Sequence, residues 1–417
     1  MNCSLILALL SGVKYFMAAE DNFQKNVTIV GGSLASINAA RALRRAKHEG
    51  NITFISGEPY LPYDRPPLSK QVLTGEWPPD RVALVDDSML EKLNLDLRLG
   101  IKATGLDRQN QAVALSDGTN VEYDALIVAT GAAPRKLPNT EHLSGVYTLR
   151  TLNDSLAIKQ AFEKSPKVVV VGAGFIGAEV AAASRKHGLD TTVVEALPQP
   201  LSTSVGEEVG AACAKLHENN GVKIYCNSPV EALEGDKSVE GVRLSSGEII
   251  PADIVVVGIG VVPETSWLEG ADLDIENGLL CDETCLAAEN IFAIGDVARW
   301  YNPLFGETMR VEHWTNAIEQ ARHVARSIAS GETSPFAPLP YVWSDQYETS
   351  IQYVGYASSY DEVKIVHGDL DSLKFIALYR KNDRLAAALS FDQQQILGDF
   401  RQIISNQSSW EDALKIC

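Results

Sequence analysis

Residues 168–195 constrain the fold more than any other stretch: four valines, a glycine-rich turn, an alanine-rich run and a second apolar run that ends in an acid. Four consecutive valines predict a strand that is buried on both faces, as in a parallel sheet. In the turn, Gly172, Gly174 and Gly177 have the spacing G-x-G-x-x-G. The first glycine permits the tight turn, the second lets the backbone approach a pyrophosphate, and the third lets helix and strand pack closely. The stretch therefore predicts a dinucleotide-binding strand–helix–strand unit with the pyrophosphate at the helix N-terminus.

The acid at the end of this stretch predicts which dinucleotide binds. Glu195 lies 23 residues after Gly172, close to the ~20 expected for an acid that contacts the ribose. A carboxylate accepts a hydrogen bond from a 2′-hydroxyl and repels a 2′-phosphate, which favours NAD(H) over NADP(H). We expect Ile176, inside the turn, and Gly260, at the end of the apolar run 253–260, to line the same site.

Residues 27–58 repeat the pattern imperfectly. Gly31 keeps the first glycine position, whereas Ser33 and Ser36 stand at the second and third. Ser56 aligns with Glu195, and the nearest acid is Glu58. We interpret this unit as a second dinucleotide site, in which Ser33 can donate to a phosphate. Two such units in one chain indicate FAD together with NAD(P)H.

Three further segments support this interpretation. The proline-rich loop 62–70 fixes an extended backbone and carries Arg65 and Lys70, although taken alone it is better explained as a solvated surface loop. The segments 121–135 and 290–299 each contain a buried apolar run that ends in glycine, as expected at crossings between nucleotide domains. In the second of them, Asp296 can accept a hydrogen bond from the ribityl chain of a flavin.

Composition limits the possible partners and compartment. The 417-residue chain has a formal net charge of −18, which argues against nucleic acid but not against an acidic protein that docks on a local basic patch. Its six cysteines include no C-x-x-C pair, so we expect a reducing, cytoplasmic compartment with no disulfide framework and no metal site. The apolar run 4–13 is too short to span a bilayer. We expect residues 1–16 to be an extension before a natural start at Met17, and the alternative is a weak signal or membrane anchor.

Taken together, the motifs GGSLAS, PYDRPPLSK, ATGAAPRKLP, GAGFIGAEVAA, VVVGIGVVP, IFAIGDVA, EHWTNAIEQA and VWSDQY resemble those of the NADH-dependent ferredoxin reductases of bacterial oxygenase systems. This family includes rubredoxin and putidaredoxin reductases, and its fold is similar to that of glutathione reductase. The resemblance covers about residues 27–390. It implies an α/β fold with two Rossmann-like dinucleotide-binding domains and a C-terminal α+β domain. The expected parts are an extension over 1–25, an FAD domain over 26–134 and 262–334, an NAD domain over 135–261, and the C-terminal domain over 335–417.

The resemblance also implies roles for particular residues. Lys70 and Glu179 match a Lys–Glu pair beside the flavin and the nicotinamide, in which the lysine stabilises negative charge near the reduced flavin. The family often has an acid where this chain has Gly57, so Glu58 is the substitute expected here. The positions that match flavin contacts are Ala35, Lys70, Ala103, Arg135, Asp296 and Trp314.

The implied activity is hydride transfer from NADH to FAD, followed by transfer of single electrons to a ferredoxin or rubredoxin that feeds an oxygenase or a cytochrome P450. Neither strand–helix–strand unit contains a cysteine, so a disulfide reductase is disfavoured. We expect Cys281 and Cys285, which flank a predicted hairpin, to be structural. Two alternatives remain open: a monodehydroascorbate-type reductase, and an NADH-sensing flavoprotein similar to apoptosis-inducing factor.

A basic cluster offers a docking site for the carrier. The segment 311–330 predicts a helix that carries Arg322, His323 and Arg326, although a solvated helix face is an equally good explanation. A second candidate patch on the first helix consists of Arg44, Arg45 and Lys47. The C-terminal region predicts strands near 351–356 and 373–379 and a helix near 394–404. Its segment 390–393 departs from the family pattern, which leaves the identity of the partner open.

Overall fold

The structure is a computed structural model that describes residues 25–417. The expectations for residues 1–16 and Met17 lie outside these residues. The described chain forms two compact units, each made of three segments. The first unit contains residues 25–64, 83–132 and 262–340, and the second contains residues 65–82, 133–261 and 341–417.

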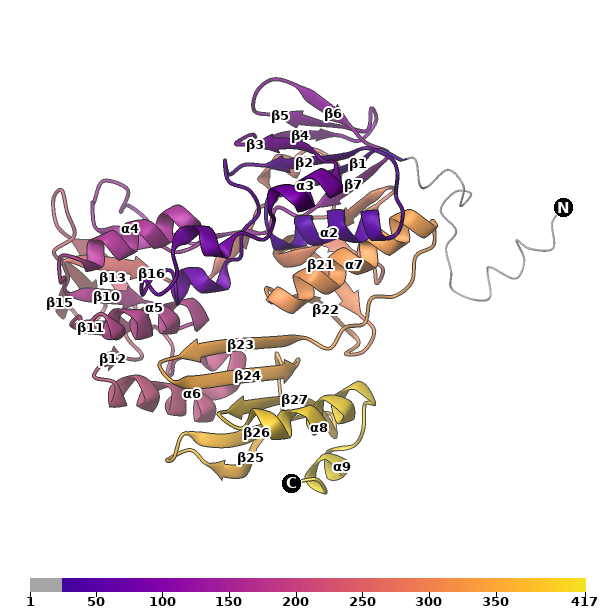
Figure 1. Ribbon diagram of the computed structural model, residues 1–417. Helices are drawn as coiled ribbons and strands as arrows, with labels where there is room; N and C mark the ends of the chain where they lie inside the picture. Colours follow the sequence, from indigo (N-terminus) through magenta and orange to yellow (C-terminus); the bar gives the residue numbers. More distant parts are fainter. Residues whose placement is uncertain (1–24) are drawn as a thin grey trace. The chain divides into compact units, whose positions relative to one another are not determined.

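The first unit is built on a six-stranded, mostly parallel sheet (Figure 1). All four residues of β1, a strand in the middle of this sheet, are buried, as expected for a strand covered on both faces. In sheet order the strands are β19 (Leu286–Ala288), β20 (Ile291–Ala293), β7 (Ala125–Val128), β1 (Val27–Val30), β2 (Ile52–Ser56) and β3 (Asp96–Leu99). Strand β19 alone is antiparallel to its neighbour.

Two helices of the first unit, α2 (Leu34–Arg45) and α7 (Trp314–Ser330), lie side by side (Figure 1). The short helix α3 (Asp87–Leu93) contributes to an apolar cluster that includes Ile37 and Phe54. Two small sheets complete this unit. They consist of β4 (Ala103–Asp107), β5 (Ala112–Leu115) and β6 (Asn120–Glu122), and of β18 (Leu279–Cys281), β21 (Ala298–Asn302) and β22 (Glu307–Arg310).

The second unit contains the parallel sheet that the four valines predict. Its strands, in order, are β12 (Lys223–Tyr225), β11 (Thr191–Val194), β10 (Val168–Val171), β16 (Ile254–Val257) and β9 (Val146–Thr148). The valine strand β10 pairs in parallel with β11 and β16. The helices of this part are α4 (Leu152–Phe162), α5 (Phe175–Lys186) and α6 (Ser202–Asn219). A small antiparallel sheet adds β13 (Val230–Glu234), β14 (Gly241–Leu244) and β15 (Ile249–Pro251).

The C-terminal part of the second unit is the antiparallel sheet with a closing helix that the sequence predicts. Its strands, in order, are β23 (Tyr341–Gln346), β24 (Thr349–Gly355), β27 (Arg384–Phe391), β26 (Lys374–Lys381) and β25 (Glu362–Asp369). They are followed by the helices α8 (Gln394–Ser405) and α9 (Trp410–Leu414). The mixed α/β architecture therefore matches the fold class expected from the sequence.

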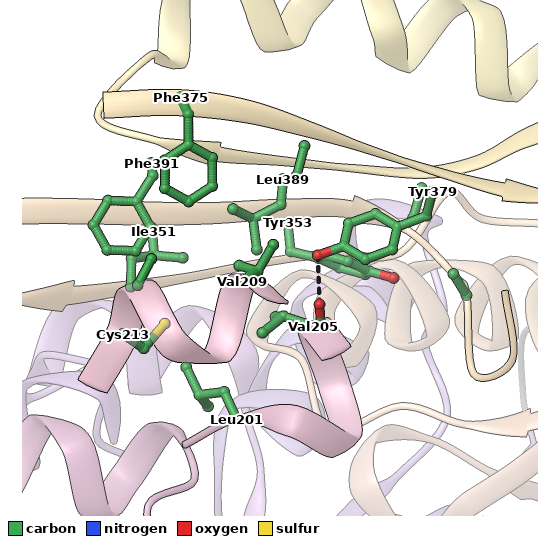
Figure 2. Close-up of a cluster of buried hydrophobic side chains, with 14 of the residues drawn as sticks. Leu201, Val205, Val209, Cys213, Ile351, Tyr353, Phe375, Tyr379, Leu389 and Phe391 are labelled. Carbon is green, nitrogen blue, oxygen red and sulfur yellow. Dashed lines mark hydrogen bonds between the residues drawn. The ribbon is translucent and has the colours of Figure 1, made fainter. Parts of the chain in front are cut away.

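Helix α6 packs its apolar face on this C-terminal sheet (Figure 2). Phe375 and Phe391 stack with their ring centroids 5.0 Å apart. The helix is interrupted at Gly206, which has φ +80, and the Tyr379 hydroxyl donates to the carbonyl of Val205 at 2.8 Å. The shared apolar cluster packs α6 and the C-terminal sheet into one core of the second unit.

Candidate functional site

The first glycine turn follows β1 and is closed by contacts that exclude a side chain. Gly31 has φ +136, and a Cβ built on it would lie 2.0 Å from the Ala129 carbonyl oxygen. A Cβ on Gly32 would lie 2.0 Å from the Ser56 hydroxyl. Ser33 precedes α2, but its side chain does not cap the helix. The first-turn N–H groups of α2 thus have no capping side chain, so the turn fits a phosphate.

The acid expected near this turn is held by a tyrosine. Ser56 and Glu58 are linked by two hydrogen bonds, from the Ser56 hydroxyl to the Glu58 carbonyl and from the Glu58 N–H to Ser56. The Glu58 carboxylate accepts from the Tyr63 hydroxyl at 2.5 Å. At Gly57, where relatives often have an acid, a Cβ would lie 3.0 Å from Cγ of Lys102. The first turn therefore has a serine at the position of Glu195, and Glu58, two residues further on, is the nearest acid.

The turn at Gly295 lies against the start of α2. Gly295 has φ +72, and its N–H donates to Oε1 of the buried Gln320 at 2.7 Å. A Cβ on Gly295 would lie 3.3 Å from Cβ of Ala35. The structure thus brings Asp296, Ala35 and the first glycine turn into one region of the first unit. Ala103, which begins β4, is half-buried.

The indole of Trp314 is hydrogen-bonded to the proline-rich loop 62–70. Trp314 begins α7, and its Nε1 donates to Oδ1 of Asp64 at 2.8 Å. Asp64 is the acid of the PYDR segment. The two motifs that seemed independent in the sequence are therefore in contact.

The second glycine turn fits a pyrophosphate at all three glycine positions. A Cβ on Gly172, which has φ +95, would lie 2.4 Å from the Gly258 carbonyl oxygen. A Cβ on Gly177 would lie 2.0 Å from the Gly172 carbonyl oxygen. By contrast, no heavy atom of the described residues comes within 4 Å of a Cβ on Gly174. The turn is thus tight where helix meets strand and open where the phosphate is expected.

Glu195, the acid expected to contact a ribose, is hydrogen-bonded to the backbone of the second turn. The residue is 9% exposed. Oε2 accepts from the N–H of Ala173 at 2.6 Å, and Oε1 accepts from the N–H of Leu197 at 2.9 Å. Each carboxylate oxygen can accept more than one hydrogen bond, so contact with a ribose hydroxyl is compatible with both bonds.

Ile176 and Gly260 are the other residues expected at this turn. Ile176 is 45% exposed on the first turn of α5. The N–H of Arg135 donates to the Gly260 carbonyl at 2.9 Å, and Gly260 has φ +91. An exposed apolar side chain beside the glycine turn suits the flat face of a base or a ribose.

Lys70 and Glu179 form a largely buried ion pair. Nζ of Lys70 lies 2.7 Å from Oε2 of Glu179, and the two side chains are 14% and 4% exposed. Lys70 directly follows the 3₁₀ helix η2 (Pro66–Ser69), which is tied down by a hydrogen bond from the Ser155 hydroxyl to the Leu68 carbonyl at 2.6 Å. The paired charges are compatible with burial because each stabilises the other.

Arg65, the other cation of the proline-rich loop, is held differently. Its Nη1 donates to the Arg150 carbonyl at 2.5 Å. The guanidinium is thus positioned by the backbone next to α4.

Two serines that the sequence analysis did not select also contact Glu179. The Ser69 hydroxyl donates to Oε2, and the Ser344 hydroxyl donates to Oε1 at 2.7 Å. Ser344 belongs to the VWSDQY motif, so the motif was recognised without a role for its serine. A small polar residue at a buried strand position was the signal that could have found it.

The predicted basic cluster on α7 is smaller than expected. Arg322 and Arg326 are exposed, whereas His323 is turned inward and packs on Phe336 with ring centroids 5.1 Å apart. Burial lowers the pKa of His323. Because His323 packs inward, the exposed part of the predicted basic cluster consists of Arg322 and Arg326.

The second basic patch also loses a member. The half-buried guanidinium of Arg44 donates to four backbone carbonyls, those of His48, Gly50, Leu93 and Asn94. Arg44 therefore stabilises the end of α2, and only Arg45 and Lys47 are exposed.

The described cysteines are free thiols. Burial raises the pKa of the Cys213 thiol to about 12 and also raises those of Cys281 and Cys285. The predicted hairpin between Cys281 and Cys285 is wrong, because β18 and β19 pair with different partners, β21 and β20. Buried, protonated thiols of this kind are poor nucleophiles.

The described residues were also expected to hold no metal and no membrane-spanning segment. Over residues 25–417, no group of three or more His, Cys, Asp or Glu side chains is placed to hold a metal ion. In the same residues, no helix has the length and apolar character needed to cross a membrane.

The fold and the two turns define a two-dinucleotide flavoprotein. Residues 25–321 match the pyridine nucleotide-disulphide oxidoreductase family, and residues 341–415 match the reductase C-terminal family. This chain belongs to the pyridine nucleotide-disulphide oxidoreductase family, with the C-terminal domain found in its ferredoxin reductase members. It therefore uses FAD and NAD(H).

The similar proteins have names consistent with the family expected from the sequence. Rhodocoxin reductase of Rhodococcus erythropolis is 36% identical over 92% of this chain and 90% of its own length. Putidaredoxin reductase of Pseudomonas putida is 33% identical over 93% of each chain. The reductase in a crystal structure of the covalent putidaredoxin reductase–putidaredoxin complex superposes with a TM-score of 0.88 at 32% identity, over 92% of this chain and 93% of that one.

Proposed function

We propose that this chain is an FAD-dependent reductase that takes hydride from NADH and passes single electrons to a ferredoxin or rubredoxin feeding an oxygenase or a cytochrome P450. The observation that carries the proposal is the pair of glycine turns, each shaped for a dinucleotide, in a chain whose described cysteines are free and absent from both turns. Relatives named for rhodocoxin and putidaredoxin support an iron–sulfur acceptor. When bound, FAD supplies the conversion between a two-electron donor and a one-electron acceptor.

The first turn would hold FAD. Gly31 and Ser33 bind its pyrophosphate at the N-terminus of α2, while Asp296 accepts from the ribityl chain. Ala35, Ala103 and Trp314 line the flavin, and Glu58 faces the adenosine ribose. These residues fall in the proposed FAD domain, residues 26–134 and 262–334.

The second turn would hold NADH in the proposed NAD domain, residues 135–261. Gly172, Gly174 and Gly177 admit the pyrophosphate, and Glu195 accepts from the ribose 2′-hydroxyl. Its negative charge repels the 2′-phosphate of NADPH. Ile176 and Gly260 line the rest of this site, whereas Arg135 contacts the flavin.

Lys70 and Glu179 act on the hydride step. The ammonium of Lys70 stabilises the negative charge that follows hydride transfer, because a fixed cation in a water-poor site interacts more strongly than in water. Glu179 holds Lys70 in place and orients the carboxamide of the nicotinamide. Neither residue removes a proton from a substrate.

The exposed pair Arg322 and Arg326 would dock the acidic carrier by steering its charge. Because the five described cysteines are free thiols, we also propose a reducing, cytoplasmic compartment.

The test is NADH-driven cytochrome c reduction with and without an added [2Fe–2S] ferredoxin and, separately, a rubredoxin. We expect one carrier to raise the rate at least about 10-fold. If neither carrier does so although NADH bleaches the flavin rapidly, the acceptor is a small molecule, as for a monodehydroascorbate-type reductase, or the role is NADH sensing as in apoptosis-inducing-factor-like proteins.

The same assay tests the docking helix. In the double variant Arg322→Glu/Arg326→Glu, the apparent KM for the carrier should rise about 10-fold while the rate with a small dye stays unchanged. Equal losses with carrier and dye would contradict docking at α7.

A further inference from the structure

The buried face of β23 is polar where a core strand should be apolar. Ser344 and Gln346 are both 0% exposed, and the residue between them, Asp345, is exposed. Side chains alternate along a strand, so Ser344 and Gln346 point to the same, buried side. Buried polar side chains are costly unless they are hydrogen-bonded, which means that this face has a specific partner.

The partner of Ser344 is Glu179 on α5. The Ser344 hydroxyl donates to Oε1 at 2.7 Å. Among the described residues 25–417, Lys70 and Ser69 both bind Oε2, whereas Ser344 is the one donor to Oε1. The carboxylate is 4% exposed. Ser344 therefore decides how the carboxylate is rotated, because without it one oxygen is buried with no donor.

Gln346 fixes the direction of this hydrogen bond. Its Nε2 donates to the Ser344 hydroxyl oxygen at 3.2 Å. Since that oxygen accepts from Gln346, the hydroxyl hydrogen of Ser344 is left to point at Glu179. The result is a one-way chain of donors from the amide of Gln346 through Ser344 to the carboxylate, in which each bond strengthens the next.

The helix and the strand that carry the two ends of the Ser344–Glu179 hydrogen bond are both packed on one core. Phe175, one helical turn before Glu179 on the same face of α5, packs against the apolar cluster of α6 and the C-terminal sheet. Ser344 pairs in register with Ile351 of β24, which belongs to the same cluster. The distance from Ser344 to Glu179 is thus set by a shared core rather than by a mobile loop.

We infer that Ser344, on the C-terminal sheet, is a positioning residue for hydride transfer: it holds Glu179, and through Glu179 the ammonium of Lys70, in the orientation that the hydride step needs. The C-terminal part of the chain thereby contributes to the reductive half-reaction as well as to any contact with a carrier. This inference rests on the proposed role of the Lys70–Glu179 pair.

The test is anaerobic single-turnover reduction of the FAD-loaded protein by NADH, which separates the limiting rate of flavin bleaching from the NADH concentration that half-saturates it. In Ser344→Ala the limiting rate should fall about 10-fold, with less than about a 2-fold change in half-saturation, because the hydrogen bond to a buried charge is lost. The matched control is Ser390→Ala, which removes an equally buried hydroxyl from β27 of the same sheet. It should stay within about 2-fold of the parent in both quantities.

A double mutant separates positioning from general damage. In a Glu179→Ala background the carboxylate is gone, so adding Ser344→Ala should change the limiting rate by less than about 2-fold. The inference is overturned if Ser344→Ala behaves like Ser390→Ala, or if it slows both backgrounds equally. If Glu179→Ala itself bleaches as fast as the parent, the proposed role of the ion pair is wrong. If Glu179→Ala is slow and Ser344→Ala is not, only the role of Ser344 is wrong.

Discussion

The two glycine turns occupy equivalent positions in their sheets, but a carboxylate contacts one of them and a neutral hydroxyl lies against the other. In each, the first glycine lies against a carbonyl of the neighbouring strand, Ala129 for Gly31 and Gly258 for Gly172. In the second turn a carboxylate, Glu195, accepts from the backbone of the next residue, Ala173. In the first turn the aligned Ser56 places a neutral hydroxyl against the equivalent Gly32.

The comparison separates two tasks that we assign to one acid in the second turn. Forming the turn does not need a carboxylate, since in the first unit the Ser56 hydroxyl lies against Gly32 and bonds to Glu58 instead. Discriminating between ribose and phosphorylated ribose needs a charge, and only the second turn has one in that place. The first turn has no such discrimination to make if it holds FAD, whose ribose carries no 2′-phosphate.

The third glycine position gives the largest expected contrast. Gly177→Ala places a Cβ about 2 Å from the Gly172 carbonyl oxygen, so α5 must move away from β10. We expect NADH affinity to fall on the order of 100-fold, with FAD retained. The equivalent change in the first turn, Ser36→Ala, removes a buried hydroxyl that has no hydrogen-bond partner among the described residues.

Ser36→Ala should therefore bind FAD as well as the parent. Both variants are measured by flavin content after purification and by NADH titration of the flavin spectrum. Equal losses in the two variants would show that the turns do not differ in this way.

Changing Glu195 is expected to have the next largest effect, on the preference for NADH over NADPH. Replacing Glu195 with alanine would remove the acceptor for Ala173 and disturb the turn itself, so Glu195→Gln is the sharper change. It keeps an acceptor oxygen and removes the charge, and we expect the preference for NADH over NADPH to shrink about 10-fold. The preference is the ratio of kcat/KM for the two nucleotides.

Glu58→Gln is the matched control in the first turn. Its carboxylate is bound to the Tyr63 hydroxyl, and a glutamine oxygen can accept the same bond, so nucleotide preference should not move. An unchanged preference in Glu195→Gln would show that Glu195 only fastens the turn.

The sequence carried the local parts of this description well. A run of valines, a glycine spacing and an acid at the right distance predict the second turn, because each depends on residues within 30 positions of one another. The strands and the closing helix of the C-terminal region also followed from apolar patterns.

The sequence did not predict contacts between residues that are far apart in the chain. Glu179 and Ser344 are 165 positions apart, and alternation along β23 indicates that Ser344 is buried without indicating what it touches. The inward turn of His323 and the carbonyl contacts of Arg44 likewise depend on neighbouring elements. A helical wheel places a side chain on a face, but the partner of that face is set by tertiary packing.

The most direct test of the central claim, that electrons leave from the flavin without a cysteine relay, is an anaerobic titration of the FAD-loaded protein with NADH. The described cysteines are free, and three of them are buried with raised pKa values. We therefore predict complete bleaching of the flavin by one equivalent of NADH, with no change in the number of titratable thiols. Consumption of a second equivalent, with the appearance of two new thiols, would reveal a redox-active disulfide and contradict the account.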